Sequence, residues 1–324
     1  MRIPFNQPQP AGSELEYLRQ AIENRHLSGD GPFSRKCHKW LTDVLGTQKA
    51  LLTHSCTGAL EMAAILLDLQ PGDEVIMPSF TFVSTANAFV LRGAVPVFVD
   101  IRQDTLNIDE NLIESAVTKK TRAIVVVHYA GVACEMDAIM ELAHKHGLTV
   151  IEDAAHAVLA TYKGKHLGSI GHLSALSFHE TKNLIAGECG ALLVNEPSFA
   201  KRSEIIREKG TNRSAFFRGE IDKYTWVDLG SSYLPSELQA AFLYAQFEKA
   251  EEIIQDRLRI WNCYHELLKP LEQQGFIRRP VVPAWCGHNG HLYYLVVKTA
   301  EIRDELLAYL KRREVSALFH YVPL

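Results

Sequence analysis

Two charged residues follow apolar runs that are typical of buried strands. Lys182 lies between the apolar run 173–178 and the glycine-rich stretch 187–190, and Asp153 ends the apolar run 150–153. A lysine that forms a Schiff base and an acid that pairs with a pyridinium nitrogen are the two protein groups that pyridoxal phosphate requires. The pair therefore indicates pyridoxal phosphate chemistry, although a lysine on a loop is more often only a solvated charge.

Hydroxyl-bearing residues mark a second place where chemistry is expected. The apolar run 49–53 is followed by Ser55 and Thr57, and then by a helix with apolar residues at helical spacing. Either hydroxyl can cap this helix, and the free N–H groups and positive dipole end of a helix bind phosphate. Capping alone also explains these side chains, so both interpretations stay open.

Aromatic and basic side chains add candidates for ligand binding. Phe80 or Phe82 can stack on a planar cofactor, and core packing is the simpler interpretation for each of them alone. The glycine-rich loop 28–33 either joins two helices or faces a substrate. In the long polar and aromatic loop further along, Arg213 and Arg218 have the guanidinium geometry that suits phosphate oxygens.

Short apolar runs alternate with helical patterns through the first half of the chain. The runs cover 49–53, 74–77, 95–99, 123–127 and 148–151, and helices are expected at 84–91, 109–117 and 135–146. This alternation predicts an α/β fold with a mainly parallel sheet covered on both faces. Ligands of such sheets bind at the carboxyl ends of the strands, where every candidate named above is expected.

The second half of the chain predicts the rest of the large domain and a smaller α+β one. We expect a strand at 190–195, a helix at 197–209, a long helix from Pro235 towards Leu271, a helix at 300–313, and strands at 292–298 and 315–319. The resulting division is a large cofactor-binding domain at 1–234, with an N-terminal segment at 1–30, and a linking helix with a small C-terminal domain at 235–324.

Composition restricts the possible functions. The chain has 324 residues, 47% of them hydrophobic, and a formal net charge of −4, which is ordinary for a globular protein and disfavours nucleic acid or an anionic membrane surface as a partner. It has no signal-peptide pattern and no apolar run long enough to cross a membrane. Its six cysteines are scattered without zinc-site spacing, so we expect no metal and a cytoplasmic location.

Three segments together point to a known family: Ser55-Cys56-Thr57-Gly58-Ala59-Leu60, Glu152-Asp153-Ala154-Ala155-His156 and Ser177-Phe178-His179-Glu180-Thr181-Lys182-Asn183. They occur in family order and at family-like spacing, and from Phe5 to its last residue the chain resembles the DegT/StrS-type sugar-nucleotide aminotransferases. Within the family, segments 78–88, 128–137, 210–213 and 223–226 look most like those of the members that make dTDP-4-amino-4,6-dideoxygalactose.

The resemblance implies the type I pyridoxal-phosphate fold, which is that of aspartate aminotransferase. It also implies a homodimer or dimer of dimers that moves an amino group from glutamate to the 4-keto group of a dTDP-4-keto-6-deoxy-hexose. Its implied catalytic residues are Lys182, the Schiff-base lysine, and Asp153, the partner of the pyridinium nitrogen.

The resemblance further implies a set of binding residues. The residues expected to contact the cofactor are Thr57, Gly58 and Ser177 at its phosphate, Phe82 on its ring, His156 near its phenolic oxygen, and Ser232 from the neighbouring subunit. Substrate is expected at Asp30, Arg213 and Tyr321.

Two departures from the family pattern accompany the resemblance. Ser232 stands in Gly230-Ser231-Ser232 where relatives have a Gly-x-Asn motif. Relatives also continue past the segment that ends this chain at His320-Tyr321-Val322-Pro323-Leu324, so the small domain is expected to be incomplete.

Three other functions remain to be compared with this one. A family dehydratase would carry a histidine in place of Lys182, which argues against it. A nicotinamide dehydrogenase would need a Gly-x-Gly-x-x-Gly motif after an early strand, and none is present. A non-catalytic protein of the same fold, with a sensing or assembly role, is consistent with a shortened small domain but does not account for both Lys182 and Asp153.

Overall fold

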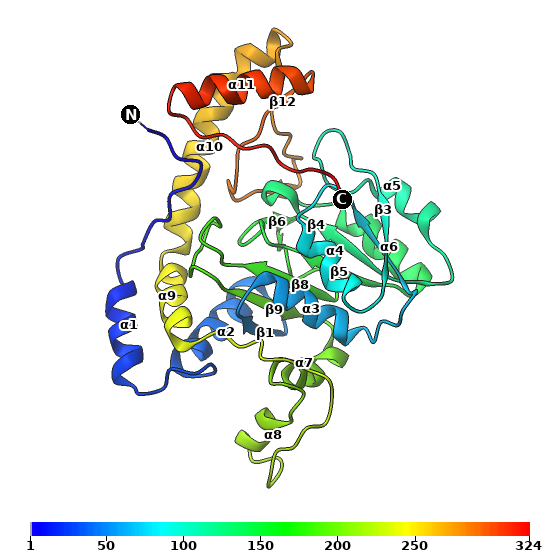
Figure 1. The fold of residues 1–324 in the computed structure, drawn as a ribbon, viewed down its shortest axis with the longest axis vertical. Helices are drawn as coiled ribbons and strands as arrows, with labels where there is room; N and C mark the ends of the chain where they lie inside the picture. Colours follow the sequence, from blue (N-terminus) through cyan, green and yellow to red (C-terminus); the bar gives the residue numbers. More distant parts are fainter. Residues whose placement is uncertain (1) are drawn as a thin grey trace.

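The computed structural model describes residues 2–324 and is organised around one seven-stranded sheet (Figure 1). The strands, in spatial order, are β1 (Lys49–Thr53), β9 (Gly190–Val194), β8 (Leu173–Ser177), β5 (Thr149–Asp153), β4 (Thr121–Val127), β2 (Glu74–Pro78) and β3 (Val95–Val99). Only β9 runs against its two neighbours, and the other pairings are parallel. The carboxyl ends of β1, β8 and β5 therefore meet at one edge of the sheet.

Helices cover both faces of this sheet and enclose two separate cores. One core includes side chains from α2 (Pro32–Leu45), α6 (Met136–His146) and α9 (Glu237–Glu248), and the other includes side chains from α3 (Cys56–Leu66), α4 (Val83–Val90) and α7 (Ala200–Arg207). Successive residues of a strand point to opposite faces. Accordingly Ile124 and Val126 lie in the first core, whereas Ala123 and Val125 lie in the second.

The C-terminal part of the chain stands above the sheet. Helix α10 (Ala250–Gln273) rises out of the large domain and carries α11 (Ala300–Arg312) across its far end (Figure 1). Two small sheets accompany it, one of β10 (Ile277–Arg278) and β12 (Val296–Val297), the other of β11 (Cys286–Gly287), β6 (Thr161–Tyr162) and β7 (Lys165–His166). The remaining helices are α1 (Glu14–Glu23), α5 (Glu110–Ile113), α8 (Arg213–Phe217) and 3-10 turns at Glu114–Ala116, Tyr129–Gly131 and Pro197–Phe199.

The expected elements of the large domain are confirmed with small changes in their bounds. The helix expected at 109–117 is split between α5 and a 3-10 turn, and the helix expected at 197–209 begins with another 3-10 turn before α7. The long helix expected from Pro235 is interrupted at Lys249, which separates α9 from α10. Helix α9 packs in the first core, and α10 leads from it towards the upper part of the molecule (Figure 1).

Two expected strands of the small domain are wrong in extent or in kind. Of the strand expected at 292–298, only Val296 and Val297 pair, with β10. The segment 315–319 forms no strand. Within residues 2–324 its backbone pairing is a single β-bridge, between Val315 and Ile3 of the N-terminal segment. A β-branched sequence becomes a strand only where a neighbouring strand offers free hydrogen-bonding groups.

Every helix within residues 2–324 is too short or too polar to cross a membrane. The same residues contain no cluster of histidine, cysteine and acidic side chains that could hold a metal ion.

Candidate active site

Lys182 lies in the connection between β8 and β9, at the edge where the strand ends meet. This connection is folded on itself by backbone hydrogen bonds, among them Phe178 N–H to Cys189 O at 2.8 Å and Lys182 N–H to His179 O at 2.9 Å. The Lys182 side chain is half-buried, and this burial lowers the pKa of its amine, against the opposite effect of Cys56 and Asp153. A lowered pKa leaves more of the amine neutral and nucleophilic near neutral pH.

Asp153 lies at the end of β5 and is held by two hydrogen-bond donors. The Thr85 hydroxyl donates to its Oδ2 at 2.7 Å, and the backbone N–H of Ala155 donates to its Oδ1 at 3.2 Å. Thr81 Oγ1 lies 2.7 Å from Thr85 Oγ1, and since the Thr85 proton goes to Asp153, Thr81 must donate. Only 5% of Asp153 is exposed, and this burial raises the pKa of its carboxyl.

The donors to Asp153 show what its carboxylate can bind. Two donors occupy part of its acceptor capacity, and a cationic ring N–H would fill the remainder and offset the cost of burying the charge. Sequence patterns singled out Asp153 and not Thr85, because a threonine inside a helix carries no sign of a partner so far away in the sequence.

His156 is buried beside this pair with a defined tautomer. Burial and the Lys182 charge hold the pKa of its imidazole well below the ordinary value, so the ring is neutral. Its Nδ1 accepts from Ala130 N–H at 3.4 Å, which assigns the ring proton to Nε2. His156 therefore has an Nε2–H donor that its contact with Ala130 leaves free. Its ring stacks on His291 with centroids 4.3 Å apart.

The expected phosphate-binding residues meet where α3 begins. Gly190 pairs with both Thr53 of β1 and Ser177 of β8, so the two strand ends lie on either side of it. A Cβ at Gly190 would lie 2.5 Å from the backbone nitrogen of Cys56, the first residue of α3. Glycine thus allows this helix end and Ser177 to share one small space, which fits a phosphate bound to backbone N–H groups.

The hydroxyls near α3 divide into a cap and a free candidate. Ser55 Oγ accepts from Gly58 N–H at 3.0 Å and is the N-cap of α3. Thr57 Oγ1 donates to Ser84 Oγ at 2.8 Å and keeps its acceptor side open. Capping therefore explains Ser55, and Thr57 remains the better phosphate ligand of the two.

Aromatic residues surround the same edge of the sheet. Phe82 is 58% exposed at the N-terminus of α4, one turn before Thr85. Phe80 contacts Tyr129 and Tyr321 edge to face, at centroid distances of 5.1 and 5.5 Å. Tyr321 thus lies against this aromatic group, and burial together with the Asp153 charge raises the pKa of its phenol.

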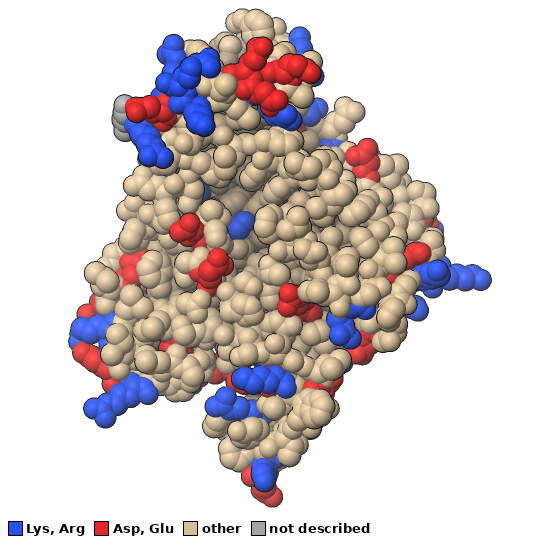
Figure 2. Space-filling view, in the orientation of Figure 1, with Lys and Arg blue, Asp and Glu red and all other residues tan. Residues whose placement is uncertain are grey.

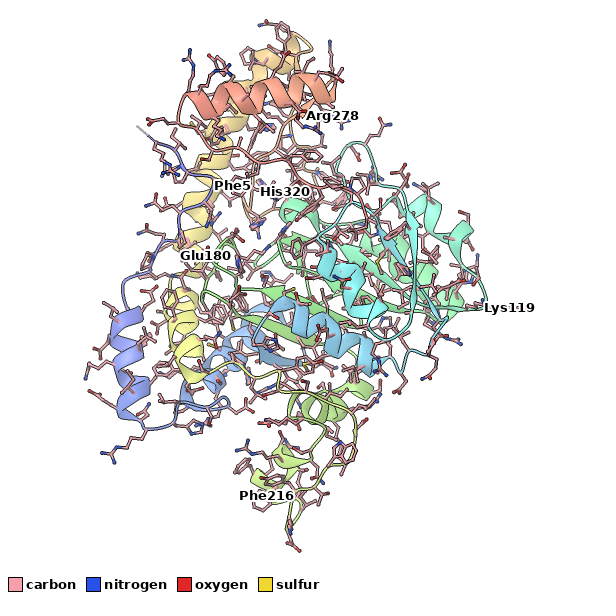
Figure 3. All side chains as sticks on the ribbon, viewed as in Figure 1. Phe5, Lys119, Glu180, Phe216, Arg278 and His320 are labelled. Atoms are coloured by element: carbon pink, nitrogen blue, oxygen red, sulfur yellow. The ribbon has the colours of Figure 1, made fainter. Side chains whose placement is uncertain are left out.

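The space above these residues is open to one side. Figure 2 shows a hollow in the molecular face between the sheet and the upper elements α10 and α11. In Figure 3, His320 and Phe5 lie above this hollow, and Glu180, two residues before Lys182, lies below them. The His320 and Phe5 rings are 6.1 Å apart, so the chain ends border the hollow.

Three expected ligand-binding residues lie elsewhere in the protomer. Asp30 pairs with Arg207, and Arg213 pairs with Glu208 at 3.3 Å. Both line a pocket of about 610 Å³ formed by α2, β1, α7 and α8, which does not include Lys182. Ser232 is exposed and bridges to Glu208.

Figure 3 places Phe216, on the same helix α8 as Arg213, at the opposite end of the molecule from His320. Asp30, Arg213 and Ser232 are therefore not gathered around Lys182 within one chain.

The chain matches the model of the DegT/DnrJ/EryC1/StrS aminotransferase family over residues 8–324. It is 35% identical to the spore coat polysaccharide biosynthesis protein SpsC of Bacillus subtilis, over 99% of this chain and 84% of that protein. This chain belongs to the DegT/DnrJ/EryC1/StrS aminotransferase family.

Solved structures agree with this assignment. The putative sugar aminotransferase Spr1654 of Streptococcus pneumoniae superposes with a TM-score of 0.92 at 26% identity, over 100% of this chain and 85% of that one. DesV of S. venezuelae gives a TM-score of 0.89 at 31% identity, over 99% and 84% of the two chains. Spr1654 has also been solved in PLP and PMP forms. The fold is thus the type I pyridoxal-phosphate fold, and pyridoxal phosphate is the cofactor of this family.

Proposed function

We propose that this protein transfers an amino group from glutamate to the 4-keto group of a dTDP-4-keto-6-deoxy-hexose. Membership of a family of pyridoxal-phosphate-dependent sugar aminotransferases supports the reaction type. The observation that carries the proposal is the half-buried Lys182 amine, beside Asp153 and His156. The substrate rests on segments 78–88, 128–137, 210–213 and 223–226, which resemble those of aminotransferases that make dTDP-4-amino-4,6-dideoxygalactose.

Lys182 provides the amine of the reaction. When bound, pyridoxal phosphate supplies an aldehyde that joins covalently to an amine and a ring that withdraws electrons from that bond. The lowered pKa of Lys182 favours the neutral amine, which can attack the aldehyde. The same neutral amine, when not bonded to the cofactor, would accept the α-proton of glutamate and return it at a neighbouring carbon.

Asp153 and His156 set the charge around the cofactor ring. The Asp153 carboxylate accepts a hydrogen bond from the ring nitrogen and keeps it protonated, which increases the electron withdrawal. The Nε2–H of His156 is a neutral donor suited to a phenolic oxygen, and the lowered pKa of its imidazole means that it donates without placing a positive charge beside Lys182.

The remaining cofactor contacts follow from position. We assign Thr57, Gly58 and Ser177 to the phosphate, because they surround the beginning of α3. We assign Phe82 to the face of the ring, since it lies one turn from the threonine that holds Asp153. Tyr321 lies against the aromatic residues of this edge and is the substrate contact that one chain supplies by itself.

We further propose a homodimer, in which Asp30, Arg213 and Ser232 contribute to the site of the other subunit. Phe82, Val83, Val90 and Leu91 leave 58, 47, 46 and 70% of their surfaces exposed along α4. Figure 2 shows that charged residues are sparse across the middle of this face. Apolar patches of this kind commonly mark protein interfaces. A nucleotide-linked substrate also supports the cytoplasmic location expected from the sequence.

The test is a coupled assay on the purified chain with pyridoxal phosphate, glutamate and a panel of nucleotide-linked ketosugars. We expect 2-oxoglutarate and an amino sugar nucleotide in equal amounts, with dTDP-4-keto-6-deoxyglucose as the best acceptor. A better rate with a UDP-linked ketosugar would replace the proposed substrate while keeping the reaction type.

Two matched variants complete this test. Lys182→Met removes the amine and should abolish product formation, whereas Lys119→Ala removes an exposed lysine at the outer edge of the molecule and should not (Figure 3). Absence of activity in the unaltered chain with every donor and acceptor, while pyridoxal phosphate still binds, would favour the non-catalytic alternative.

A further inference from the structure

A short segment of the upper domain reaches down to the Lys182 connection. His291 Nδ1 lies 2.8 Å from Asn183 Oδ1, and Asn183 Nδ2 donates to Asn289 O at 2.9 Å. Because the Asn183 amide nitrogen is the donor in the second bond, its oxygen accepts in the first. His291 is therefore protonated on Nδ1, and each polar end of the residue after Lys182 is bound by this segment.

Asn289 connects the same segment to His156. Its Nδ2 donates to His156 O and to Val158 O, each at 2.8 Å, and its side chain is fully buried. Its Oδ1 accepts from His291 N–H at 3.1 Å. A Cβ at Gly131 would collide with this oxygen, so a glycine in the neighbouring turn is needed for Asn289 to lie where it does.

Arg257 of α10 holds the other side of the connection. Its Nη2 donates to Lys182 O at 3.1 Å, and its Nη1 donates to His291 O at 3.3 Å. Burial lowers the pKa of this guanidinium, and between residues 2 and 324 it forms no ion pair. Arg257 is only half-buried, so its charge is stabilised by these two carbonyl contacts together with the water at its exposed part. The two contacts join α10 both to the Lys182 backbone and to the segment that carries His291.

We propose that Arg257, Asn289 and His291 form a clamp that positions Lys182 and His156 for the reaction. The clamp touches the Lys182 backbone, the neighbouring Asn183 side chain and the backbone of His156, and the His291 ring stacks on the His156 ring. The clamp thus fixes Lys182 and His156 relative to each other, although its own residues lie more than one hundred positions after His156 in the sequence. All three are positioning residues, and their role rests on the function proposed above.

The clamp also keeps the Lys182 amine in a poorly solvated place. Two groups, Cys56 and Asp153, act to raise the pKa of this amine. The charged form of the amine in turn lowers the pKa of His156, His291 and His320. None of the three histidines is charged near neutral pH, since burial lowers the pKa of each. If the clamp opens, water reaches the amine, and its pKa rises towards the ordinary lysine value.

The experiment compares three single-residue variants of the full chain, each measured after its cofactor has been removed. His291→Phe keeps a ring against His156 and removes the donor to Asn183, His291→Asn keeps a donor near the Nδ1 position, and Arg257→Met removes both carbonyl contacts. Labelling of Lys182 by a small amine-reactive reagent, followed by mass spectrometry across a pH series, gives the midpoint of its titration. Hydrogen exchange of the peptide 178–187 gives the local stability of the connection.

We expect the labelling midpoint to move to higher pH in His291→Phe and in Arg257→Met, and to stay near that of the unaltered chain in His291→Asn. Exchange in 178–187 should be about tenfold faster in His291→Phe and in Arg257→Met, because each change removes one hydrogen bond to this connection, at Asn183 and at Lys182 respectively. His265→Phe is the matched control, because His265 stacks on Trp261 of α10 without contacting the Lys182 connection.

The proposal is overturned if His291→Phe and Arg257→Met both remain folded and keep the midpoint and exchange rate of the unaltered chain. It is also overturned if His265→Phe shifts the midpoint as far as they do. If only one of the two variants folds, its result decides alone. Both measurements are made without cofactor, so a failure of the proposed transamination would leave them unchanged.

Discussion

Replacing Thr85 with valine tests how Asp153 is kept charged. Valine has nearly the shape of threonine, so the change removes mainly the hydroxyl that donates to Asp153 Oδ2 at 2.7 Å and that accepts from Thr81. The Ala155 N–H at 3.2 Å then remains as the donor to a carboxylate that is only 5% exposed. A hydrogen bond to a charged group contributes about 1.5–3 kcal/mol, so the charged form of Asp153 becomes less stable by about that amount.

This loss translates into a pH-dependent loss of cofactor affinity. Burial already raises the pKa of Asp153, and removing a donor raises it further. Where the carboxyl is protonated in the free protein, it must release a proton before it can pair with the ring nitrogen. The cost of about 1.5–3 kcal/mol then weakens binding roughly ten- to a hundredfold, whereas at higher pH, where the carboxyl is already charged, the affinities converge.

The assay is titration of the cofactor-free protein with pyridoxamine phosphate, which has no aldehyde and therefore reports ring binding without a covalent bond to Lys182. Thr85→Ser is the control, since it keeps the hydroxyl and should bind within a few-fold of the unaltered chain. Identical affinities for Thr85→Val and the unaltered chain at every pH would refute the reasoning, and so would equal losses in the serine and valine variants.

Three further predictions concern stability. Lys182→Met should raise the free energy of unfolding near neutral pH. The folded-state pKa of Lys182 lies below its unfolded value, so below pH 10.5 the charged lysine makes the folded state less stable. Denaturation at several pH values should therefore show the gain in stability vanishing towards pH 10.5. Glu152→Gln should cost about 3 kcal/mol at pH 7, because the buried carboxylate accepts from His128 at 2.9 Å and from three backbone N–H groups. These partners lower the pKa of Glu152, so the stability that its carboxylate provides is present above pH 4.5 and is lost as the pH falls through the folded-state pKa. In urea titrations, the free energies of unfolding of the unaltered chain and of Glu152→Gln should therefore converge as the pH falls. Gly131→Ala should cost about 1–3 kcal/mol, since its φ of 78° disfavours alanine and the new methyl group meets Asn289, and a melting temperature equal to that of the unaltered chain would contradict this.

Much of the large domain follows from local sequence patterns. The runs 49–53 and 95–99 are strands with the expected bounds, and the helix expected at 135–146 is α6. These segments are predictable because β-branched runs and helical spacing act over a few residues and are then buried where they form. In the upper part the same reasoning failed at 315–319, where a suitable sequence finds no strand to pair with among residues 2–324.

The sequence by itself determined which groups are the candidates for the chemistry. Lys182, Asp153 and His156 stand at strand ends in a recognisable order, because the chemistry requires those residue types and a parallel sheet brings its strand ends to one edge. Tertiary structure alone decided how these groups are held. Thr85 meets Asp153 across 68 positions, and His291 meets Asn183 across 108. Hydrogen bonds between such distant residues depend on how helices, strands and loops pack in three dimensions and leave no local pattern, which is why the threonine and the clamp emerge only from the folded chain.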